Sequence, residues 1–550
     1  MPTQTKEANE ERAPENSPSA LELVSPTPKC EQQSLLYWRT AITIFSLCAG
    51  TLLVAIDTTI ISVAIPRIAT EFESLSDVGW YGSAYLFTVT AFQPAAGSLY
   101  RFFDTKWTYL ISVIIFEVGS VLCAAAPISE VLIFGRAIQG IGAAGLYQGA
   151  LAIIGLVVVL EKRPLAIGIV LSVFGLAVGF GPPVGGILTD QVTWRWCFWI
   201  NLPIGFAGFL ILICILKISE RQDVLNMSLR QKLSMLDIEG IILITGAVAS
   251  LVLALQWGGQ EKPWKSSQVI GLFVGAGLLL VAFGVVQWLK GDKATIPLRI
   301  LRQRSIAMGA CYLFFLEMAI YVYLFYLPFY FQSAQLVDAE TSGIRAIPLG
   351  LSQIVAVVLC SYLVTRFGYY VCSLLLHGIW AEIFQVPYMV VGPLVAIVGN
   401  VFLTRLAVDT RTAVWATYLV VTGIGTGMGL QMPFTAIQLV LSKEDVPVGN
   451  SITVFLQQLG AAIAVAIGQS IFTGGLESKL NHSDIPIPTS SVILAGPTGI
   501  RTLTLDQRLI MLIQNAYCYA FQNTMYYALA TIIASLPFAL GMQWLNTKSY

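Results

Sequence analysis

The chain has 550 residues, of which 56% are hydrophobic and only 11% charged, and its formal net charge is zero. A soluble domain typically carries about 25% charged residues and cannot bury so much apolar surface, so the composition favours a lipid bilayer as the solvent. The zero net charge argues against nucleic acid as a partner. The nine cysteines include no Cys-x-x-Cys pair, which argues against a metal site or a disulfide framework.

The first 38 residues differ from the rest of the chain. They are rich in Glu, Pro and Ser and poor in apolar residues, so they cannot offset the entropy of ordering, and we expect a disordered cytoplasmic tail over residues 1–38. The tail contains no signal peptide. We therefore expect the first apolar run to act as the targeting signal and to stay in the mature protein.

Apolar runs long enough to cross a bilayer follow one another from residue 40 onward, since a spanning helix needs roughly 20 apolar residues. We count about fourteen, which predicts an all-α polytopic membrane protein. Their approximate ranges are 40–65, 79–100, 107–127, 131–158, 164–188, 196–216, 238–256, 269–289, 305–331, 343–365, 386–404, 413–441, 448–474 and 523–545.

An even number of spans places both termini on one side of the membrane. With the termini inside, the cytoplasmic segments hold roughly twice as many Lys and Arg residues as the external ones, which favours that orientation. The predicted domains are a six-helix half over 39–217, cytoplasmic loops with two linking spans over 218–304, and a second six-helix half over 305–550. The second half includes a predicted external loop at 475–522.

A weak internal repeat supports the division into two halves. Gly140-Ile141-Gly142 is followed by Gln148, and Gly423-Ile424-Gly425 is followed by Gln431 at the same spacing. If the two linking spans are an insert, these segments are equivalent fourth helices of two duplicated halves, as in many carriers. The alternative is a chance similarity between Gly-rich membrane helices.

Two ionisable residues lie at similar predicted depth in the outer half of the bilayer. Asp57 is in the first span and Arg136 in the fourth. An isolated charge there costs several kcal/mol, so such residues usually pair with each other and face a cavity. The pair is either a coupling site for protons or substrate, or a structural ion pair that holds two helices together.

Two further carboxylates, Glu117 and Glu317, also fall inside spans. Each is either a proton site or a side chain that reaches a water pocket. The ninth span is rich in aromatic residues, which line a lipophilic substrate cavity or face lipid. These residues are Tyr312, Tyr321, Tyr323, Phe325 and Tyr326.

The fifth span carries a dense cluster of Gly and Pro. Glycines at four-residue spacing give a smooth groove for close helix packing, and two successive prolines remove backbone donors and bend the helix. The cluster therefore predicts a hinge or gate between two access states rather than a packing groove alone. It consists of Gly175, Gly179, Gly181, Pro182, Pro183, Gly185 and Gly186.

These motifs, in this order, resemble the fungal form of the fourteen-span drug:proton antiporter family of the major facilitator superfamily. The similarity runs from about residue 40 to residue 545. Four segments carry it: 53–66 with Asp57 in the first span, 136–144 with Arg136, Gln139 and Gly140, the Gly/Pro cluster of the fifth span, and 194–205 from Trp194 to Gly205.

The resemblance implies a major facilitator fold with two extra linking spans, and proton-coupled efflux of small lipophilic or toxic molecules. It implies roles in proton coupling for Asp57, Arg136 and Gln139, because the family's fourth-span Arg is implicated in coupling. It further implies a monomer in the plasma membrane without a cofactor. An importer of the same fold is the alternative, and the antiporter motif of the fifth span favours export.

One motif departs from the family pattern. The loop after the second span normally carries a Gly-x-Leu-x-Asp-x-x-Gly gating motif. Here Gly97 is present, but Arg101 replaces the Asp and Asp104 replaces the last Gly. The usual Asp role is therefore not carried over. Arg101, Asp104 and Lys106 form either a cytoplasmic gate or ordinary positive-inside flanking.

Other chemistries find little support. Two His residues cannot supply the His boxes of a membrane enzyme, and no Gly-rich phosphate loop with a Lys indicates an ATP-driven pump. The triplet Asn481-His482-Ser483 predicts N-glycosylation in the external loop, whereas the triplet at Asn226 falls in a predicted cytoplasmic loop.

Residues 371–385 form a segment that is too short to span the bilayer. Omitting them joins two spans by a short turn, keeps the reading frame and removes residues whose codons can form splice sites. We interpret the segment as a retained intron. The alternative is an interfacial helix with His377 and Glu382 at the headgroup level.

Overall fold

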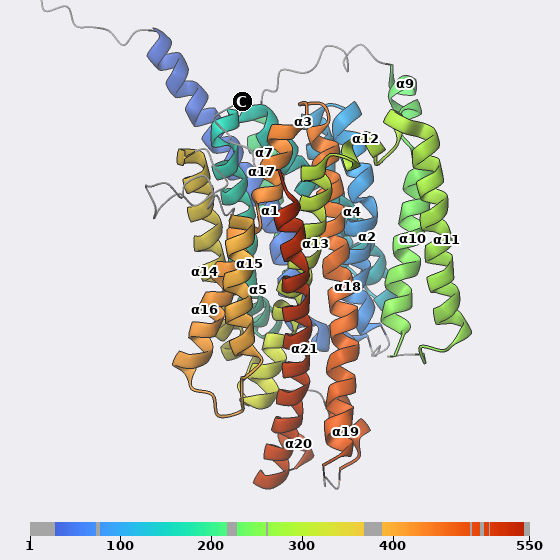
Figure 1. The fold of residues 1–550 in the computed structure, drawn as a ribbon, viewed down its shortest axis with the longest axis vertical. Helices are drawn as coiled ribbons and strands as arrows, with labels where there is room; N and C mark the ends of the chain where they lie inside the picture. Colours follow the sequence, from blue (N-terminus) through green and yellow to red (C-terminus); the bar gives the residue numbers. More distant parts are fainter. Residues whose placement is uncertain are drawn as a thin grey trace, which may run out of the picture.

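A computed structural model of the chain describes residues 28–72, 77–216, 228–259, 262–367, 388–483, 487–495, 500–504 and 506–543. Every regular element within these ranges is a helix (Figure 1). The first half contains α1 (Pro28–Glu71), α2 (Val78–Phe102), α3 (Thr105–Ala124), α4 (Ser129–Val157), η1 (Leu160–Lys162), α5 (Arg163–Gln191), α6 (Trp196–Trp199) and α7 (Asn201–Ile215).

The linking segment and the second half follow in the same manner. The linking segment contains α9 (Leu229–Ser234), α10 (Ile238–Trp257), α11 (Ser267–Lys290), η2 (Gly291–Lys293) and α12 (Leu298–Leu301). The second half contains α13 (Arg304–Phe329), η3 (Tyr330–Ala334), α14 (Ala339–Phe367), α15 (Tyr388–Leu403), α16 (Thr412–Gly429), α17 (Met432–Val440), α18 (Val446–Asn481), α19 (Thr489–Ala495), α20 (Ile500–Leu503) and α21 (Gln507–Gly541).

The described helices agree with the predicted spans. Eleven helices are long and apolar enough to cross a membrane, and a bent pair within α5 makes a twelfth. The two remaining predicted runs correspond to α2, which ends beside Arg101, and to α15, which has 16 residues. Each of the fourteen runs therefore contains a helix or a broken helix pair, which confirms the all-α membrane fold.

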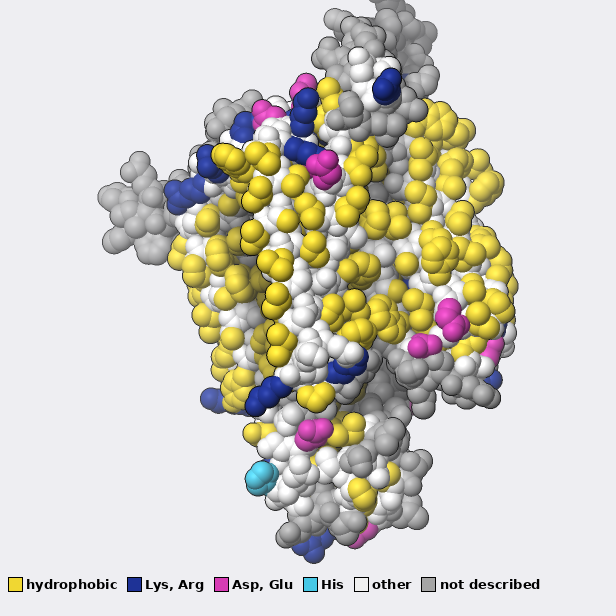
Figure 2. Space-filling view, turned by 90° about the vertical axis from the view of Figure 1, so that its right-hand side faces the viewer, with side chains coloured by type: hydrophobic (Ala, Val, Ile, Leu, Met, Phe, Trp, Pro, Cys, Tyr) yellow, Lys and Arg dark blue, Asp and Glu magenta, His cyan; other side chains and the backbone are white. Residues whose placement is uncertain are grey.

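The helices run between two polar ends. The described chain begins with α1 and ends with α21 at the same end of the molecule, the top of Figure 1, and we call this end the terminal face. Figure 2 shows hydrophobic side chains over the middle of the molecule, whereas the visible charged side chains gather toward the two ends. This distribution is the one expected of a protein whose middle faces lipid.

Two seams join the halves. At one seam α5 of the first half packs along α14 of the second, and at the other α2 packs against α18. The linking helices α10 and α11 pack on each other at one side of the bundle (Figure 1), and α10 contacts both α2 and α18. The linking pair therefore covers the second seam.

The internal repeat recurs as equivalent packing. In α4, Gly140 lies against α2 and Gly142 lies against the backbone of Phe116 in α3. In α16, Gly423 lies against α14 and Gly425 against the backbone of Ala396 in α15. A side chain at any of these glycines would collide with the neighbouring helix, so the repeated Gly-x-Gly sets close helix packing in both halves.

Two expected boundaries are wrong. Residues 28–38 were expected to be disordered, but they form the beginning of α1. The last helix begins at Gln507 and not near residue 523, because residues 507–522 continue the helix and bury Ile510, Ile513 and Ala516 within the second half. The predicted external loop 475–522 is thus largely helical where it is described. The suspected intron at 371–385 lies outside the described residues.

Candidate functional site

Asp57 and Arg136 form an ion pair inside the first half. A guanidinium nitrogen of Arg136 contacts the Asp57 Oδ2 atom, and the exposed fractions of the two side chains are 0% and 1%. Gln139, one turn after Arg136 on α4, completes a closed ring. Its Nε2 donates to Asp57 Oδ1 at 2.7 Å, and its Oε1 accepts from Arg136 Nη1 at 2.8 Å. We call these three residues the charge triad.

Helices α2, α3, α6 and α7 surround the charge triad. The Arg136 Nε atom donates to the Tyr81 carbonyl at 2.9 Å, and the guanidinium lies 4.4 Å from the centre of the Tyr85 ring. On the other side, Ser120 Oγ accepts from Gln139 at 3.3 Å and from Asn201 at 2.9 Å. The polar groups of the triad therefore contact hydrogen-bond partners or an aromatic ring, as a buried ion pair requires.

The sequence analysis did not predict these surroundings. It expected Asp57 and Arg136 to face a cavity, whereas both lie among helices of a single half. Asn201 falls in the segment 194–205, to which the sequence assigned no role, and nothing in the sequence pointed to Ser120. Only the packing of α3 against α4, and of α7 against α1 and α3, brings Ser120 and Asn201 to the triad.

The residues after Asp57 connect α1 to the Gly/Pro cluster of α5. The Thr59 hydroxyl donates to the Ala177 carbonyl at 3.0 Å, and Gly181 lies so close to Thr59 that a side chain would collide with it. Gly185 lies against the Ile60 carbonyl in the same way, and Gly186 is half-buried. The hinge motif is thus in contact with the helix that carries Asp57.

The opposite side of the same cluster faces the second half. Gly175 packs against Ile354 and the Gly350 carbonyl of α14, and Pro182 and Pro183 approach Gly343 of α14. The helix bends by 42° between Ala177 and Gly179. The prolines explain the position of the bend, because Pro182 and Pro183 cannot donate to the carbonyls four residues earlier, at 178 and 179. The cluster therefore combines a bend with a seam between halves.

The two other intramembrane carboxylates have few partners. Both Glu117 oxygens are buried without a hydrogen-bond partner among the described residues, and the side chain lies against Gly205 of α7. Glu317 Oε2 accepts from Gln457 of α18 at 3.2 Å. The other end of that amide accepts from the Tyr147 hydroxyl of α4 at a long 3.5 Å. Glu317 is thus linked across the seam, while Glu117 stays within the first half.

Two of the four predicted gate residues contact the second half at the terminal face. Gly97 packs directly against Ser451 and the Pro447 carbonyl of α18. Arg101 Nη2 lies 3.4 Å from Asp445 Oδ1, immediately before α18. Gly97 and Arg101 therefore hold the α2–α18 seam, with a helix contact and an ion pair.

Asp104 and Lys106 bind within the first half. Asp104 is the N-cap of α3 and accepts from the Trp107 amide at 2.6 Å, a standard helix-capping role. Lys106 Nζ donates to the Ile213 carbonyl at the end of α7, at 2.7 Å. These contacts stabilise helix ends, so neither residue joins Arg101 in contacting the second half.

The remaining predicted site residues are placed as follows. Of the aromatic residues in α13, Phe325 is 37% exposed and the four tyrosines are buried. Asn481 is exposed at the end of α18, where its side-chain oxygen accepts from the Thr489 hydroxyl at 2.7 Å. That position at the face opposite the termini leaves room for a glycan.

Comparison with known proteins explains this arrangement. The sequence profile of the Major Facilitator Superfamily matches residues 47–465. The chain belongs to the major facilitator superfamily. Among solved structures, the proton:xylose symporter XylE aligns with a TM-score of 0.55 at 14% identity, covering 94% of this chain and 99% of that chain. A bacterial homologue of the lysosomal transporter Spinster aligns with a TM-score of 0.54 at 17% identity, covering 90% and 95%. At these identities the likeness concerns the fold of this superfamily member.

Curated fungal relatives are similar over nearly the whole chain. The MFS-type efflux pump MFS1 of Trichophyton rubrum is 40% identical over 508 residues, which is 92% of each chain. The MFS-type transporter astH of Aspergillus oryzae is 39% identical and covers 93% of this chain and 88% of that protein. The efflux pump aflT of Aspergillus parasiticus is 37% identical and covers 92% and 95%.

Proposed function

We propose that this superfamily member exports small lipophilic molecules, such as a secondary metabolite or drugs, in exchange for protons. The export direction is supported by the similarity to proteins named efflux pumps, one of which is called an aspyridones efflux protein. The observation that carries the coupling is the closed charge triad. A buried charge pair is costly to maintain in a membrane, and such pairs usually serve ion or proton movement.

The coupling follows from the hydrogen bonds of Asp57. Both of its oxygens accept hydrogen bonds in the closed triad, so the carboxylate form is the one that the triad binds. A proton on Asp57 removes the charge that holds Arg136 and leaves a buried cation without its partner. The first half must then rearrange until Arg136 finds other partners, or the proton must leave.

That rearrangement has a route to the second half. Thr59 follows Asp57 closely on α1 and is bonded to the bent part of α5, and α5 in turn packs along α14. A shift of α1 therefore changes the bend of α5 at the seam. Movement of one half against the other around such seams is the general basis of alternating access.

The remaining parts of the proposal concern orientation and gating. The terminal face lies in the cytoplasm and the protein works as a monomer in the plasma membrane, with Asn481 glycosylated outside. The gate at the terminal face includes Gly97 and Arg101, which contact α18. Asp104 and Lys106 contribute by fixing the ends of α3 and α7.

Transport assays test this function. Cells that express the protein are loaded with the lipophilic dye rhodamine 6G, and export is followed with and without a proton uncoupler. We expect faster export than from empty-vector cells, and loss of the difference with the uncoupler. Net uptake that needs the proton gradient would favour the importer, and export that is insensitive to the uncoupler would refute proton coupling.

A further inference from the structure

At the terminal face, a buried carboxylate, Asp237, holds the two ends of the linking hairpin together. This residue caps α10, where its Oδ1 atom accepts from the Gly240 amide at 2.8 Å, and its side chain is buried. It also accepts hydrogen bonds from three residues at the end of α11 and just after it. These are Gln287 at 2.6 Å, Lys290 at 2.8 Å and the Thr295 amide at 3.1 Å.

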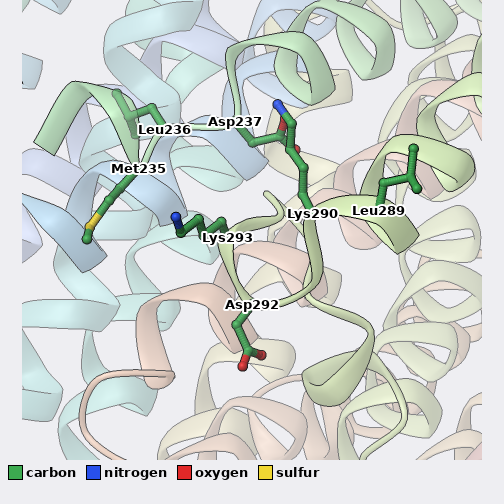
Figure 3. Close-up of a pocket in the computed structure, with 7 residues that line it drawn as sticks. All are labelled: Met235, Leu236, Asp237, Leu289, Lys290, Asp292 and Lys293. Atoms are coloured by element: carbon green, nitrogen blue, oxygen red, sulfur yellow. The ribbon is translucent and has the colours of Figure 1, made fainter. Parts of the chain in front are cut away.

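These bonds make the end of the hairpin a fixed structure. Burial opposes the charged carboxylate, but the hydrogen bonds from Lys290, Gln287 and two backbone amides outweigh it and lower the pKa of Asp237 to about 2. Asp237 and Lys290 both line a hollow of about 510 Å³. Figure 3 shows these two side chains close together, with Asp292 pointing away from them. The segment from Lys290 to Thr295 is thus held against the start of α10.

The fixed segment leads directly to Arg299 in α12, which binds the second half. Its Nη1 and Nη2 atoms contact the two Asp445 oxygens at 3.0 and 3.2 Å, a bidentate pair with fixed geometry. Its Nε atom also donates to Asp292 Oδ1 at 3.2 Å. Asp445 is therefore oriented from the linking segment.

The same carboxylate is the partner of Arg101 from the first half. Arg101 contacts Asp445 Oδ1, and its Nη1 atom donates to the Asp292 carbonyl at 3.2 Å. The Asp445 side chain is only 9% exposed, and its charge is compensated by Arg101 and Arg299, with a further hydrogen bond from the Ser442 hydroxyl at 3.2 Å. Three parts of the chain thus meet at one carboxylate: α2, the linking segment, and the start of α18.

We propose that Arg299 is a positioning residue of the gate at the terminal face, and that the linking helices form the third part of that gate. Arg299 holds the Asp445 carboxylate toward Arg101, while α10 covers the seam between α2 and α18. This inference rests on the proposed gating role of Arg101. The linking helices then contribute to gating, because the segment that Asp237 holds in place determines the position of Arg299.

Hydrogen–deuterium exchange of the full chain in lipid nanodiscs tests this inference without substrate or proton gradient. We expect Arg299→Ala to speed amide exchange about three- to tenfold at the start of α18 and also at the end of α2, which Arg299 does not pair with. The size corresponds to losing one partly exposed charge pair. Arg299→Lys, which keeps the charge but not the bidentate contact, should be intermediate.

The matched control is Arg302→Ala, since Arg302 is an exposed residue of the same segment. It should exchange like the unchanged protein. With Arg101→Ala in the background, Arg299→Ala should no longer affect the end of α2. An unchanged end of α2 in both Arg299 variants, or an equal effect of Arg302→Ala, would overturn the inference. If Arg299→Ala does not assemble, Arg299→Lys provides the same comparison. Uncoupler-insensitive transport would refute the proposed function and leave this result standing.

Discussion

In the first half, both oxygens of the Asp57 carboxylate accept hydrogen bonds, from Arg136 and Gln139. In the second half, the buried carboxylate of Glu317 accepts a hydrogen bond from the neutral amide of Gln457. The backbone packing of the two halves is nevertheless equivalent, as the paired Gly-x-Gly contacts of α4 and α16 show. The position equivalent to Arg136 is Leu419, which is fully buried. The helix packing at these glycines is therefore similar in the two halves, while the charge chemistry differs between them. We infer that proton coupling belongs to the first half.

The largest expected effect tests the charge triad. Asp57→Asn and Arg136→Ala should each lower export more than about 100-fold, because breaking a buried pair costs about 3–5 kcal/mol. Export from vesicles measures this, with the amount of protein in the membrane determined in parallel. Glu130→Gln, which changes an exposed carboxylate on α4, is the control.

A double variant separates coupling from stability. Asp57→Asn combined with Arg136→Gln leaves no unpaired charge, so the amount of folded protein should recover while export stays absent. If export recovers together with the protein, the triad is a structural ion pair and the comparison between the halves loses its functional meaning.

A smaller effect is expected at Glu317. Glu317→Gln should lower export about three- to tenfold, because it replaces a hydrogen bond to a charged group by one between neutral groups, a difference of about 1 kcal/mol. The initial export rate in vesicles measures it. Glu117→Gln, which changes a carboxylate within the first half, provides the comparison. A loss at Glu317 as large as that of Asp57→Asn would show that both halves carry coupling.

The seam between α5 and α14 gives a matched pair of glycines. Gly175→Ala would push its new methyl group into Ile354, whereas the methyl group of Gly179→Ala would meet Ile347 at an ordinary 3.8 Å. Overpacking typically costs about 1–3 kcal/mol. We expect Gly175→Ala to lower the thermal midpoint and slow export about threefold, with Gly179→Ala close to the unchanged protein. Equal behaviour of the two variants would mean that this contact does not limit movement between the halves.

The smallest effect concerns the outer end of the second half. Treatment with a glycosidase should increase the gel mobility of the protein, and Asn481→Gln should abolish that shift without changing export, because Asn481 is exposed at the end of α18. Asn226→Gln is the control. A shift that survives Asn481→Gln and disappears in Asn226→Gln would place the terminal face outside the cell.

Some features of this fold are predictable from the sequence and others are not. The fourteen spans were predictable because a bilayer demands long apolar runs, and each run is visible in the sequence. The helix ends were less predictable. Residues 28–38 and 507–522 contain polar residues that suggested a tail and a loop, yet they extend α1 and α21. Length and hydropathy alone do not show where a spanning helix ends beyond the membrane.

The residues of the candidate site also differed in how well the sequence predicted them. Asp57, Arg136 and the Gly/Pro cluster stood out because charges, and runs of Gly and Pro, are rare in apolar segments. Ser120 and Asn201 did not stand out, because a hydroxyl and an amide are ordinary in membrane helices. Among the four gate residues, nothing in the sequence separates Arg101, which reaches Asp445, from Asp104 and Lys106, which bind within the first half.

The sequence by itself determined that this chain is a bundle of membrane-spanning helices, because hydropathy is a local property of each segment. Only the tertiary structure decided which polar groups meet. Asp445, Arg101 and Arg299 come from three distant parts of the chain, and their encounter depends on how α2, α12 and α18 converge at the terminal face. Electrostatic contacts depend on distances of a few ångströms between side chains, and those distances are set by packing.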